Sequence, residues 1–448
     1  MTQLSEHPTV KRFHELAGLM NRRESLPPLD AAWLRQLCLE AGADDVGFVE
    51  INRPALDDQR DDIVKVFPHA KTFISLVVRM NREPLRLTTR SVANVEFHHT
   101  GEHVNHTAHR IVAALEQRGI RAFHPAMGFP MEMDQTGGKA WVVSHKPVAV
   151  AAGLGHMGIH RNVIHPKFGN FILLGTVVME AEVTEHSQPI DYNPCLECKL
   201  CVSACPVGAI GSDGSFNFSA CYTHNYREFM GGFTDWVRQI ADSRDAQDYS
   251  RRVSDPESSS MWQSLSFGAN YKAAYCLAVC PAGEDVIGPF LTDRKTYLED
   301  VVKPLQEREE TVYVVPGSDA EEHVARRFPN KKTKRVGNGL NRARSIRRFL
   351  QGMPLVFQRG KSKGLDATYH FTFTGEETIQ ATVVIRNQTL QVSEGHNGDA
   401  NLHVTADTKT WLGFLAKERN LVWALLRRKI RIKGSPRLLL AFGKCFPS

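Results

Sequence analysis

The cysteines constrain this chain more than any other feature of its sequence. Seven of the nine lie between positions 195 and 280, and four of them form the run Cys195-x2-Cys198-x2-Cys201-x3-Cys205-Pro206. In such a run, three thiolates on one tight loop bind three irons of a 4Fe-4S cubane, and the fourth cysteine ligates a different cluster. Zinc instead favours two separated Cys-x2-Cys pairs. The spacing therefore predicts iron-sulfur clusters.

A second motif, Cys276-x3-Cys280-Pro281, supplies further ligands by the exchange typical of two-cluster proteins. The predicted ligand sets are Cys195, Cys198, Cys201 and Cys280 for the first cluster, and Cys205, Cys221 and Cys276 for the second. Seven thiolates are one fewer than two cubanes need, because Ala273 stands where the regular spacing would place a cysteine. We therefore expect one 4Fe-4S cluster, and beside it either a 3Fe-4S cluster or a 4Fe-4S cluster with a non-thiolate ligand. His224 and solvent are the candidates for that ligand.

Length and composition indicate several domains and no membrane span. The 448 residues are 42% hydrophobic, enough for roughly three domains. The longest apolar run, residues 171–179, is far shorter than the ~18 residues that a span requires. The N-terminus shows no secretory signal, so we expect a cytoplasmic protein whose thiols stay reduced. Residues 326–348 hold ten Lys and Arg and no acid, and this composition predicts an exposed linker rather than a nucleic-acid-binding surface.

The hydrophobic pattern predicts an α+β multidomain protein in four segments. Residues 1–185 form an α/β domain, with helices over 31–41 and 102–118 and strands over 45–49, 72–78 and 170–178. Residues 186–310 form the cysteine-organised unit, with a polar surface excursion at 242–260. Residues 311–345 are the basic linker. Residues 346–448 form a small α+β domain, with strands over 368–373, 378–386 and 389–393.

Ten of the nineteen histidines lie between positions 98 and 165. One interpretation is that they form the polar border of a packed helix whose apolar stripe faces the core. The other is that they deliver a proton at neutral pH, a task that suits the pKa of histidine. The candidates for proton donor are His98, His99 and His145. Lys139 or His160 would offer positive charge to an anionic group.

The sequence AAGLGHMGIHRNVIHPKFGNFILLGTVV at 151–178, followed directly by the cysteine run, resembles epoxyqueuosine reductases and reductive dehalogenases. The resemblance covers residues 30–285 and continues through Cys221 to the final Cys-x3-Cys-Pro. It implies a nitroreductase-like domain that binds cobalamin near Gly153, Gly155 and Gly158. It also implies a two-cluster ferredoxin-like module that passes electrons to cobalt from a low-potential donor of the ferredoxin or flavodoxin type.

Two departures from this resemblance concern the proton donor. Epoxyqueuosine reductases carry an Asp upstream of the Ala-Gly-Leu-Gly element, where this chain has Lys139, and reductive dehalogenases use a Tyr, which residues 1–191 lack. The glycine pattern also fits a dinucleotide fingerprint with Glu180 as its acid. Pro166 and Gly169 leave too short a window for the helix that such a site needs.

Residues 345–448 resemble the sterol carrier protein type 2 lipid-binding fold across its length, through a strand meander, the alternating strand 402–407 and the segment 429–434. That family encloses an apolar tunnel. The resemblance implies a lining of Trp411, Phe414, Leu421, Trp423 and Leu426. The alternative is that these side chains only form a core or a dimer face.

Together these features predict an iron-sulfur reductase, with cobalamin as the implied cofactor, that cleaves a C-X bond of an apolar organic substrate. The alternative is a non-catalytic, ferredoxin-like electron-transfer protein with a lipid-binding domain. The expected partners are a low-potential electron donor and an apolar small molecule or lipid. No nucleic-acid partner is expected.

Overall fold

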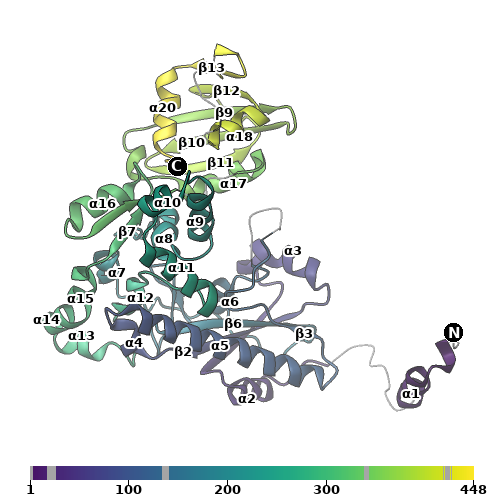
Figure 1. Ribbon diagram of the computed structural model, residues 1–448. Coiled ribbons are helices and arrows are strands. Elements are labelled where there is room, and N and C mark those ends of the chain that lie inside the picture. The colour runs from purple at the N-terminus through teal and green to yellow at the C-terminus, as the bar shows by residue number, and fades with distance from the viewer. Residues whose placement is uncertain are drawn as a thin grey trace.

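The computed structural model describes residues 4–17, 27–133, 141–337, 343–416, 418, 424 and 426–447. Figure 1 shows the N-terminal sheet and its helices in the lower part of the molecule, the cysteine-rich helices beside them, and the C-terminal sheet at the far end. None of the helices in these residues is both long enough and apolar enough to cross a membrane. The predicted mixed α+β organisation is confirmed.

The N-terminal sheet is antiparallel throughout and runs in the order β1-β2-β6-β3. Its strands are β1 (Asp45–Glu50), β2 (Thr72–Arg79), β3 (Ala122–Phe123) and β6 (Ile172–Met179). Every residue of β2 except the last is buried, because helices cover both faces of the sheet. On one face α2 (Ala31–Ala41) and α5 (Arg90–Glu116) pack through Leu34 and Ile111 against Ile74. On the other, α3 (Asp57–Val66) and α6 (His145–Ala151) pack on Phe73 and Val77.

Shorter elements complete this region. They are η1 (Leu4–Glu6), α1 (Pro8–Ala17), η2 (Pro54–Leu56), α4 (Arg82–Arg86), β4 (His156–Met157) and β5 (Val163–Ile164). The strands β4 and β5 form an antiparallel pair that places residues 156–164 beside the cysteine-rich helices. Cys38, on α2, lies in the core of this region, and Cys445 lies in that of the C-terminal region.

The cysteine-rich region is helical. Its elements are α7 (Leu200–Ala204), α8 (Phe218–Asn225), α9 (Gly231–Ala241), α10 (Ala246–Arg252), α11 (Asp255–Phe267), α12 (Tyr275–Ala278), α13 (Gly288–Thr292), α14 (Arg294–Tyr297), η3 (Leu298–Val302) and α15 (Lys303–Glu307). The polar stretch at 242–260 is helical, since α10 and the first part of α11 are built from it, and of its residues only Asp248 and Val253 are buried. A capping box of Ser254 and Glu257 begins α11, which explains how a polar stretch becomes helical.

The predicted basic linker is wrong for most of its length. Residues 311–336 contain the parallel strands β7 (Thr311–Val314) and β8 (Lys332–Arg335), with α16 (Asp319–Arg327) between them. Val312, Val324 and Phe328 are buried in one apolar cluster. The many Lys and Arg hide this packing in the sequence, because a few apolar residues form the core among them and Lys331 is itself buried against Glu310.

The C-terminal region is a five-stranded sheet in the order β11-β10-β9-β12-β13. Its elements are α17 (Ile346–Val356), η4 (Gly360–Ser362), β9 (Ala367–Thr374), β10 (Ile379–Arg386), β11 (Thr389–Glu394), β12 (Leu402–Asp407), α18 (Thr408–Leu415), β13 (Ile430–Gly434) and α20 (Pro436–Lys444). One face of the sheet packs against the helices. Alternate residues of β9, Tyr369, Phe371 and Phe373, point into this core together with Trp411 and Phe442.

Candidate iron-sulfur site

Four of the cysteines face one cavity. Its lining includes Cys195, Cys198, Cys201 and Cys280, together with Ile159, His160 and Pro281. Cys201 lies on α7, and the loop before it turns through left-handed backbone at Glu197 (φ 50°) and Lys199 (φ 62°). Residues with side chains rarely adopt this conformation, and here it wraps the loop around the cavity. Four thiols from two segments around one space fit the donor set of a 4Fe-4S cluster.

The other three cysteines lie beside the first set. Cys205, Cys221 and Cys276 share an apolar cluster with Cys201, and the Sγ atom of Cys205 accepts a hydrogen bond from the backbone N–H of Ala209 at 3.3 Å. Burial raises the pKa of Cys276 to about 12, with repulsion from Cys205 as the next cause. The fold thus brings the three residues of the second predicted set together. Their ligation of iron stays a prediction.

The thiols do not converge on a single ion. Among the described residues, no group of three or more His, Cys, Asp or Glu side chains is close enough together to hold one metal ion. A zinc site needs all of its ligands at one centre, whereas each thiolate of a cubane binds a different iron. The preference for clusters over zinc rests on the cysteine spacing.

Ala273, which stands at the position of the missing eighth cysteine, lies in a loop that the side chain of Asn225 binds. Asn225 at the end of α8 accepts hydrogen bonds through Oδ1 from the N–H groups of Ala273 at 2.9 Å and Ala274 at 3.0 Å. Ala273 itself is buried against the core around α12. The loop that leads into Cys276 is therefore held by hydrogen bonds where the regular motif would hold it by a thiolate.

His224, one of the candidates for the eighth ligand, is held beside Tyr313 and Glu310. Its Nδ1 accepts a hydrogen bond from the N–H of Tyr313 at 3.4 Å, and its Nε2 lies 4.0 Å from the carboxylate of Glu310. Burial lowers the pKa of His224 to about 4, so the ring is neutral at pH 7. Nδ1 is thus used within the fold, whereas Nε2 has no hydrogen-bond partner, and the three alternatives for the second cluster (a 3Fe-4S cluster, a solvent ligand or His224) stay predictions.

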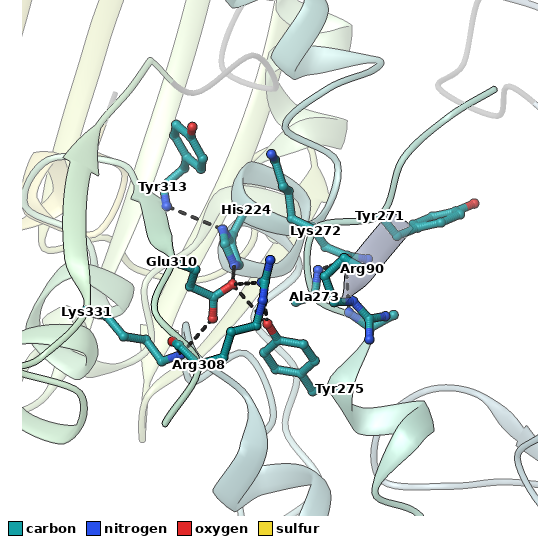
Figure 2. A network of polar contacts seen from close by, with 12 residues as sticks. Arg90, His224, Tyr271, Lys272, Ala273, Tyr275, Arg308, Glu310, Tyr313 and Lys331 are labelled. Atoms are coloured by element: carbon teal, nitrogen blue, oxygen red, sulfur yellow. Dashed lines mark hydrogen bonds and ion pairs between the residues drawn. The ribbon is translucent and has the colours of Figure 1, made fainter. Parts of the chain in front are cut away.

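Glu310 is the centre of the polar network in Figure 2. Its carboxylate pairs with Arg308 at 2.7 Å and with Lys331 at 2.8 Å, and it accepts a hydrogen bond from the hydroxyl of Tyr275 at 2.9 Å. Glu310 and Lys331 are almost completely buried. Because Tyr275 directly precedes Cys276, the network fixes the loop that carries a predicted ligand.

The candidate proton donors on α5 have different environments. His98 lies 2.9 Å through Nε2 from the carbonyl oxygen of Ala269 and packs against Gly268. His99 is exposed, with its Nδ1 at 3.9 Å from the carboxylate of Glu102. Neither is brought against the cysteines by any contact of the described residues, and their role stays a prediction. Lys139 lies outside the described residues.

His145 is held by two hydrogen bonds. Its Nδ1 lies 2.8 Å from the hydroxyl of Thr176 and its Nε2 lies 3.1 Å from the carbonyl oxygen of Ala126. A carbonyl can only accept, so Nε2 carries the proton and the hydroxyl donates to Nδ1. Burial lowers the pKa of His145, which favours this neutral form. The ring is therefore satisfied within the fold.

His160 lies between the two cysteine sets and cannot offer the positive charge expected of it. It lines the first cavity, and its Nε2 lies 3.2 Å from the side-chain amide of Asn170, whose Nδ2 is 3.5 Å from the carbonyl oxygen of Cys276. Burial is the main cause that lowers the pKa of His160 to about 4, and the charge of Lys146 is the second cause. The ring is neutral at pH 7.

Lys146 is the cation that sequence reasoning missed. Its Nζ donates to the carbonyl oxygen of Arg161 at 2.7 Å and to Oδ1 of Asn162 at 3.0 Å. Burial among surrounding atoms lowers its pKa, and the Cys276 and Cys221 thiols oppose this shift, yet the side chain is open to solvent. No signal in the sequence distinguishes Lys146 from other lysines.

An aromatic cluster stands next to the same cysteines. The rings of Tyr226 and Tyr271 are 5.7 Å apart between centroids, Phe229 lies 4.9 Å from Tyr226, and Phe97 lies 5.1 Å from Tyr271. Burial raises the pKa of Tyr226, and the neighbouring Cys221 adds to this shift. These side chains form an apolar wall near the second cysteine set, and they come from three separate elements.

The three glycines expected at a cofactor are explained by packing within the chain. A Cβ at Gly153 (φ +73°) would collide with the carbonyl oxygen of Gln188, and one at Gly155 (φ +155°) with that of Ile164. A Cβ at Gly158 would come within 2.7 Å of the His160 ring. These positions face protein atoms rather than an open cradle. The expected corrinoid contacts therefore do not fit, and we derive no step through that cofactor.

The residues expected to line a lipid tunnel differ in how exposed they are. Trp411 is 2% exposed, and its ring lies 5.6–5.8 Å from those of Phe349, Phe371, Phe373 and Phe414, so it is part of the core. Leu426 is 69% exposed. Leu421 and Trp423 lie outside the described residues. The tunnel stays a prediction.

Comparison with known proteins finds family matches for two parts of the chain. Residues 189–211 match the 4Fe-4S binding domain family, and residues 356–447 match the SCP-2 sterol transfer family. The chain is 27% identical over 193 residues to an epoxyqueuosine reductase of Cellulophaga algicola, covering 40% of this chain and 58% of the relative. It is 26% identical over 102 residues to that of Escherichia coli, covering 23% and 26%. The chain thus spans less than two thirds of these relatives.

Similar solved structures include both expected groups. A Streptococcus thermophilus epoxyqueuosine reductase gives a TM-score of 0.33 at 15% identity, covering 61% of this chain and 75% of that chain. A reductive dehalogenase gives a TM-score of 0.38 at 13% identity, covering 70% of this chain and 41% of that chain. An epoxyqueuosine reductase with a tRNA stem loop gives a TM-score of 0.30 at 17% identity, covering 43% of this chain and 56% of that chain. These scores are below 0.5, so the assignment rests on the sequence matches.

One expectation about partners is wrong. We expected no nucleic acid, but epoxyqueuosine reductases are among the relatives, and one of the similar structures holds a tRNA stem loop. The basic residues 326–348, which the composition assigned to a linker, do not decide the question. The chain joins an iron-sulfur region similar to epoxyqueuosine reductases to a C-terminal region that matches the SCP-2 sterol transfer family.

Proposed function

We propose that this chain is an iron-sulfur reductase whose two cysteine sets hold two clusters. The observation that carries the proposal is the cavity lined by Cys195, Cys198, Cys201 and Cys280, with Cys276 of the second set electrostatically coupled to Cys201. When bound, two such clusters supply stepwise one-electron transfer from the side of Cys195 to that of Cys276. A low-potential donor of the ferredoxin or flavodoxin type would provide the electrons.

The reaction we propose is reductive cleavage of a C-X bond. Two electrons and one proton convert the substrate C-X group into C-H and release X as an anion, so charge and atoms balance. The surface at Lys146, which is exposed and close enough to Cys221 and Cys276 to feel their charge, is the place for this reaction. The Lys146 ammonium, oriented by Arg161 and Asn162, would bind the departing anion or an anionic group of the substrate. The aromatic wall of Tyr226, Phe229 and Tyr271 would exclude water.

The experiment that tests the reductase is metal analysis of anaerobically purified protein. We expect iron and acid-labile sulfide for a 4Fe-4S and a second cluster, with two EPR signals over a redox titration: a 4Fe-4S cluster gives its signal after reduction, and a 3Fe-4S cluster gives its signal in the oxidised state. A Cys195→Ala variant should lose the first signal, whereas Cys38→Ala, a buried cysteine in an apolar core, should lose neither. Zinc without sulfide, or one cluster only, would refute the proposal.

Cobalamin addition separates the reductase from a non-catalytic electron-transfer protein. The resemblance implies a corrinoid, although the three glycines do not form a cradle for it. A corrinoid spectrum that changes on binding, and turnover that depends on it, would assign the cofactor. Clusters that reduce a partner protein without any turnover would favour the electron-transfer alternative.

Two substrate classes follow from the two halves of the chain. The SCP-2 match supports an apolar molecule held by residues 356–447. The match to epoxyqueuosine reductases supports a modified tRNA nucleoside. Binding of a fluorescent fatty acid and of a tRNA stem loop, each measured with the full chain and with Lys146→Gln, distinguishes them. The substrate of the reductase site should lose affinity in the variant, whereas a ligand of the C-terminal region should not.

A further inference from the structure

Arg90, at the start of α5, differs from every other buried cation of the described residues. Four Lys and Arg residues are buried there, and three of them have a carboxylate partner: Arg53 with Glu50 at 2.6 Å, Arg227 with Asp235 at 2.7 Å and Lys331 with Glu310 at 2.8 Å. Arg90 has no carboxylate within ion-pair distance in this part of the chain. Its NH1 donates to the carbonyl oxygens of Leu85 at 3.1 Å and Leu87 at 3.2 Å, and its Nε has no partner.

An unpaired buried charge is strongly destabilising, because removal from water is not repaid by an opposite charge. Burial lowers the pKa of Arg90 to about 10, so the guanidinium is still charged at neutral pH. Two carbonyl dipoles are a partial compensation only. The fold therefore leaves this positive charge without a carboxylate in direct contact, and the charge of Glu310 acts on it only from beyond ion-pair distance.

The guanidinium lies next to the loop of the second cysteine set. Its Cζ is 5.3 Å from the ring centroid of Tyr275, the residue before Cys276, and Figure 2 shows both beside Ala273. One turn further along α5, Asn94 accepts a hydrogen bond from the N–H of Tyr271 at 2.8 Å and donates to its carbonyl oxygen at 3.2 Å. The same stretch of helix thus carries the charge and anchors the loop.

We propose that Arg90 is a positioning residue that supplies the counter-charge of the second cluster and raises its reduction potential. A cluster with its thiolates is a buried anion, and reduction adds one more negative charge. A nearby fixed cation stabilises the reduced form more than the oxidised form. If the second cluster is a 4Fe-4S cluster with a solvent ligand, the absence of a thiolate at Ala273 also makes it less negative and acts in the same direction. The second cluster would therefore hold an electron more firmly than the first.

This inference rests on the proposed pair of clusters, and an EPR-monitored redox titration of the anaerobically purified full chain tests it. At the wild-type midpoint of the second cluster, Arg90→Gln should reduce the ratio of reduced to oxidised cluster about tenfold. For a one-electron couple, a tenfold change corresponds to 59 mV. The first cluster should change less than twofold. Arg90→Lys, which keeps the cation, should also stay within twofold for both clusters.

Arg86 provides the matched control. It lies four residues earlier, is largely buried, and has a carboxylate partner in Glu83 at 3.6 Å. Arg86→Gln should leave the second midpoint in place. An unchanged second midpoint in Arg90→Gln would overturn the inference, as would an equal shift in Arg86→Gln. If Arg90→Gln does not fold, a tenfold change in Arg90→Lys overturns it instead. A wild-type chain without a second EPR signal would refute the proposed function itself.

Discussion

Replacing Glu310 by Gln tests whether buried charge pairing stabilises the loop before Cys276. The change keeps the size of the side chain and removes its negative charge. Lys331, with its side chain 1% exposed, and Arg308 would then lie beside a neutral amide. His224 cannot compensate, because burial lowers its pKa to about 4 and a neutral ring offers no charge.

The expected loss is about 3 kcal/mol of unfolding free energy. Removal of one partner from a buried ion pair costs about 3–5 kcal/mol, because the other charge stays buried without compensation. Lys331 meets this condition fully. Arg308 is a quarter exposed and can reach solvent, so its contribution is smaller and the lower end of the range applies. The hydrogen bond from Tyr275 is retained by the amide oxygen.

The assay is equilibrium urea unfolding of the anaerobically purified chain at pH 7, followed by fluorescence, with iron per chain as a second readout. Asp366→Asn is the control, because Asp366 pairs with Arg386 at 2.8 Å with both side chains more than half exposed. An exposed pair contributes about 0–1 kcal/mol. A loss below about 1 kcal/mol in Glu310→Gln, or an equal loss in the control, would refute the reasoning.

Three further predictions concern the same region. Ala273→Cys restores the missing thiolate and should give about eight irons per chain with an all-cysteine second cubane by EPR; an EPR spectrum of the second cluster that is the same as in the wild type contradicts it. Gly169→Ala should lower the melting temperature and first-cluster iron more than Gly119→Ala, because both glycines have positive φ but only at Gly169 would the new Cβ collide with Ala282, next to Cys280-Pro281. His224 has a folded pKa of about 4, below the ordinary value, so its unfolded form binds the proton first. Stability should therefore fall as pH drops from about 6.5 towards 4, and His224→Gln should make that fall shallower.

The strands could be predicted from the sequence more closely than their arrangement. The expected strand over 72–78 is Thr72–Arg79, and the expected helix over 31–41 has the observed limits, because apolar runs and the Asp30 cap are local signals. The helix expected from residue 102 begins twelve residues earlier, at Arg90. Polar residues such as Arg90 and Asn94 interrupt its apolar stripe, since that end faces the cysteine-bearing loop rather than the sheet.

The cysteine sets could be predicted because the spacing itself encodes which thiols share a cluster. The groups around them could not. Lys146, Glu310 and Arg90 become partners of the cysteines only through contacts between distant segments, and each looks like an ordinary charged residue in the sequence. The basic residues 326–348 were predicted to be an exposed linker for a related reason: the sequence does not show that Lys331 and Lys334 pair with Glu310 and Glu257 of other segments.

The loss of one thiolate explains why so many separate anchors meet at residues 271–276. In a regular motif the cysteine at the Ala273 position would itself hold this loop to the cluster. Here Asn94 binds Tyr271, Asn225 binds the N–H groups of Ala273 and Ala274, and Glu310 binds the hydroxyl of Tyr275. These anchors come from α5, α8 and the start of β7, so the loop that positions Cys276 is fixed by the protein independently of any metal. A coordination position can then stay free of thiolate without the loop losing its place, which is the condition for a second cluster that differs from the first in ligand and in potential.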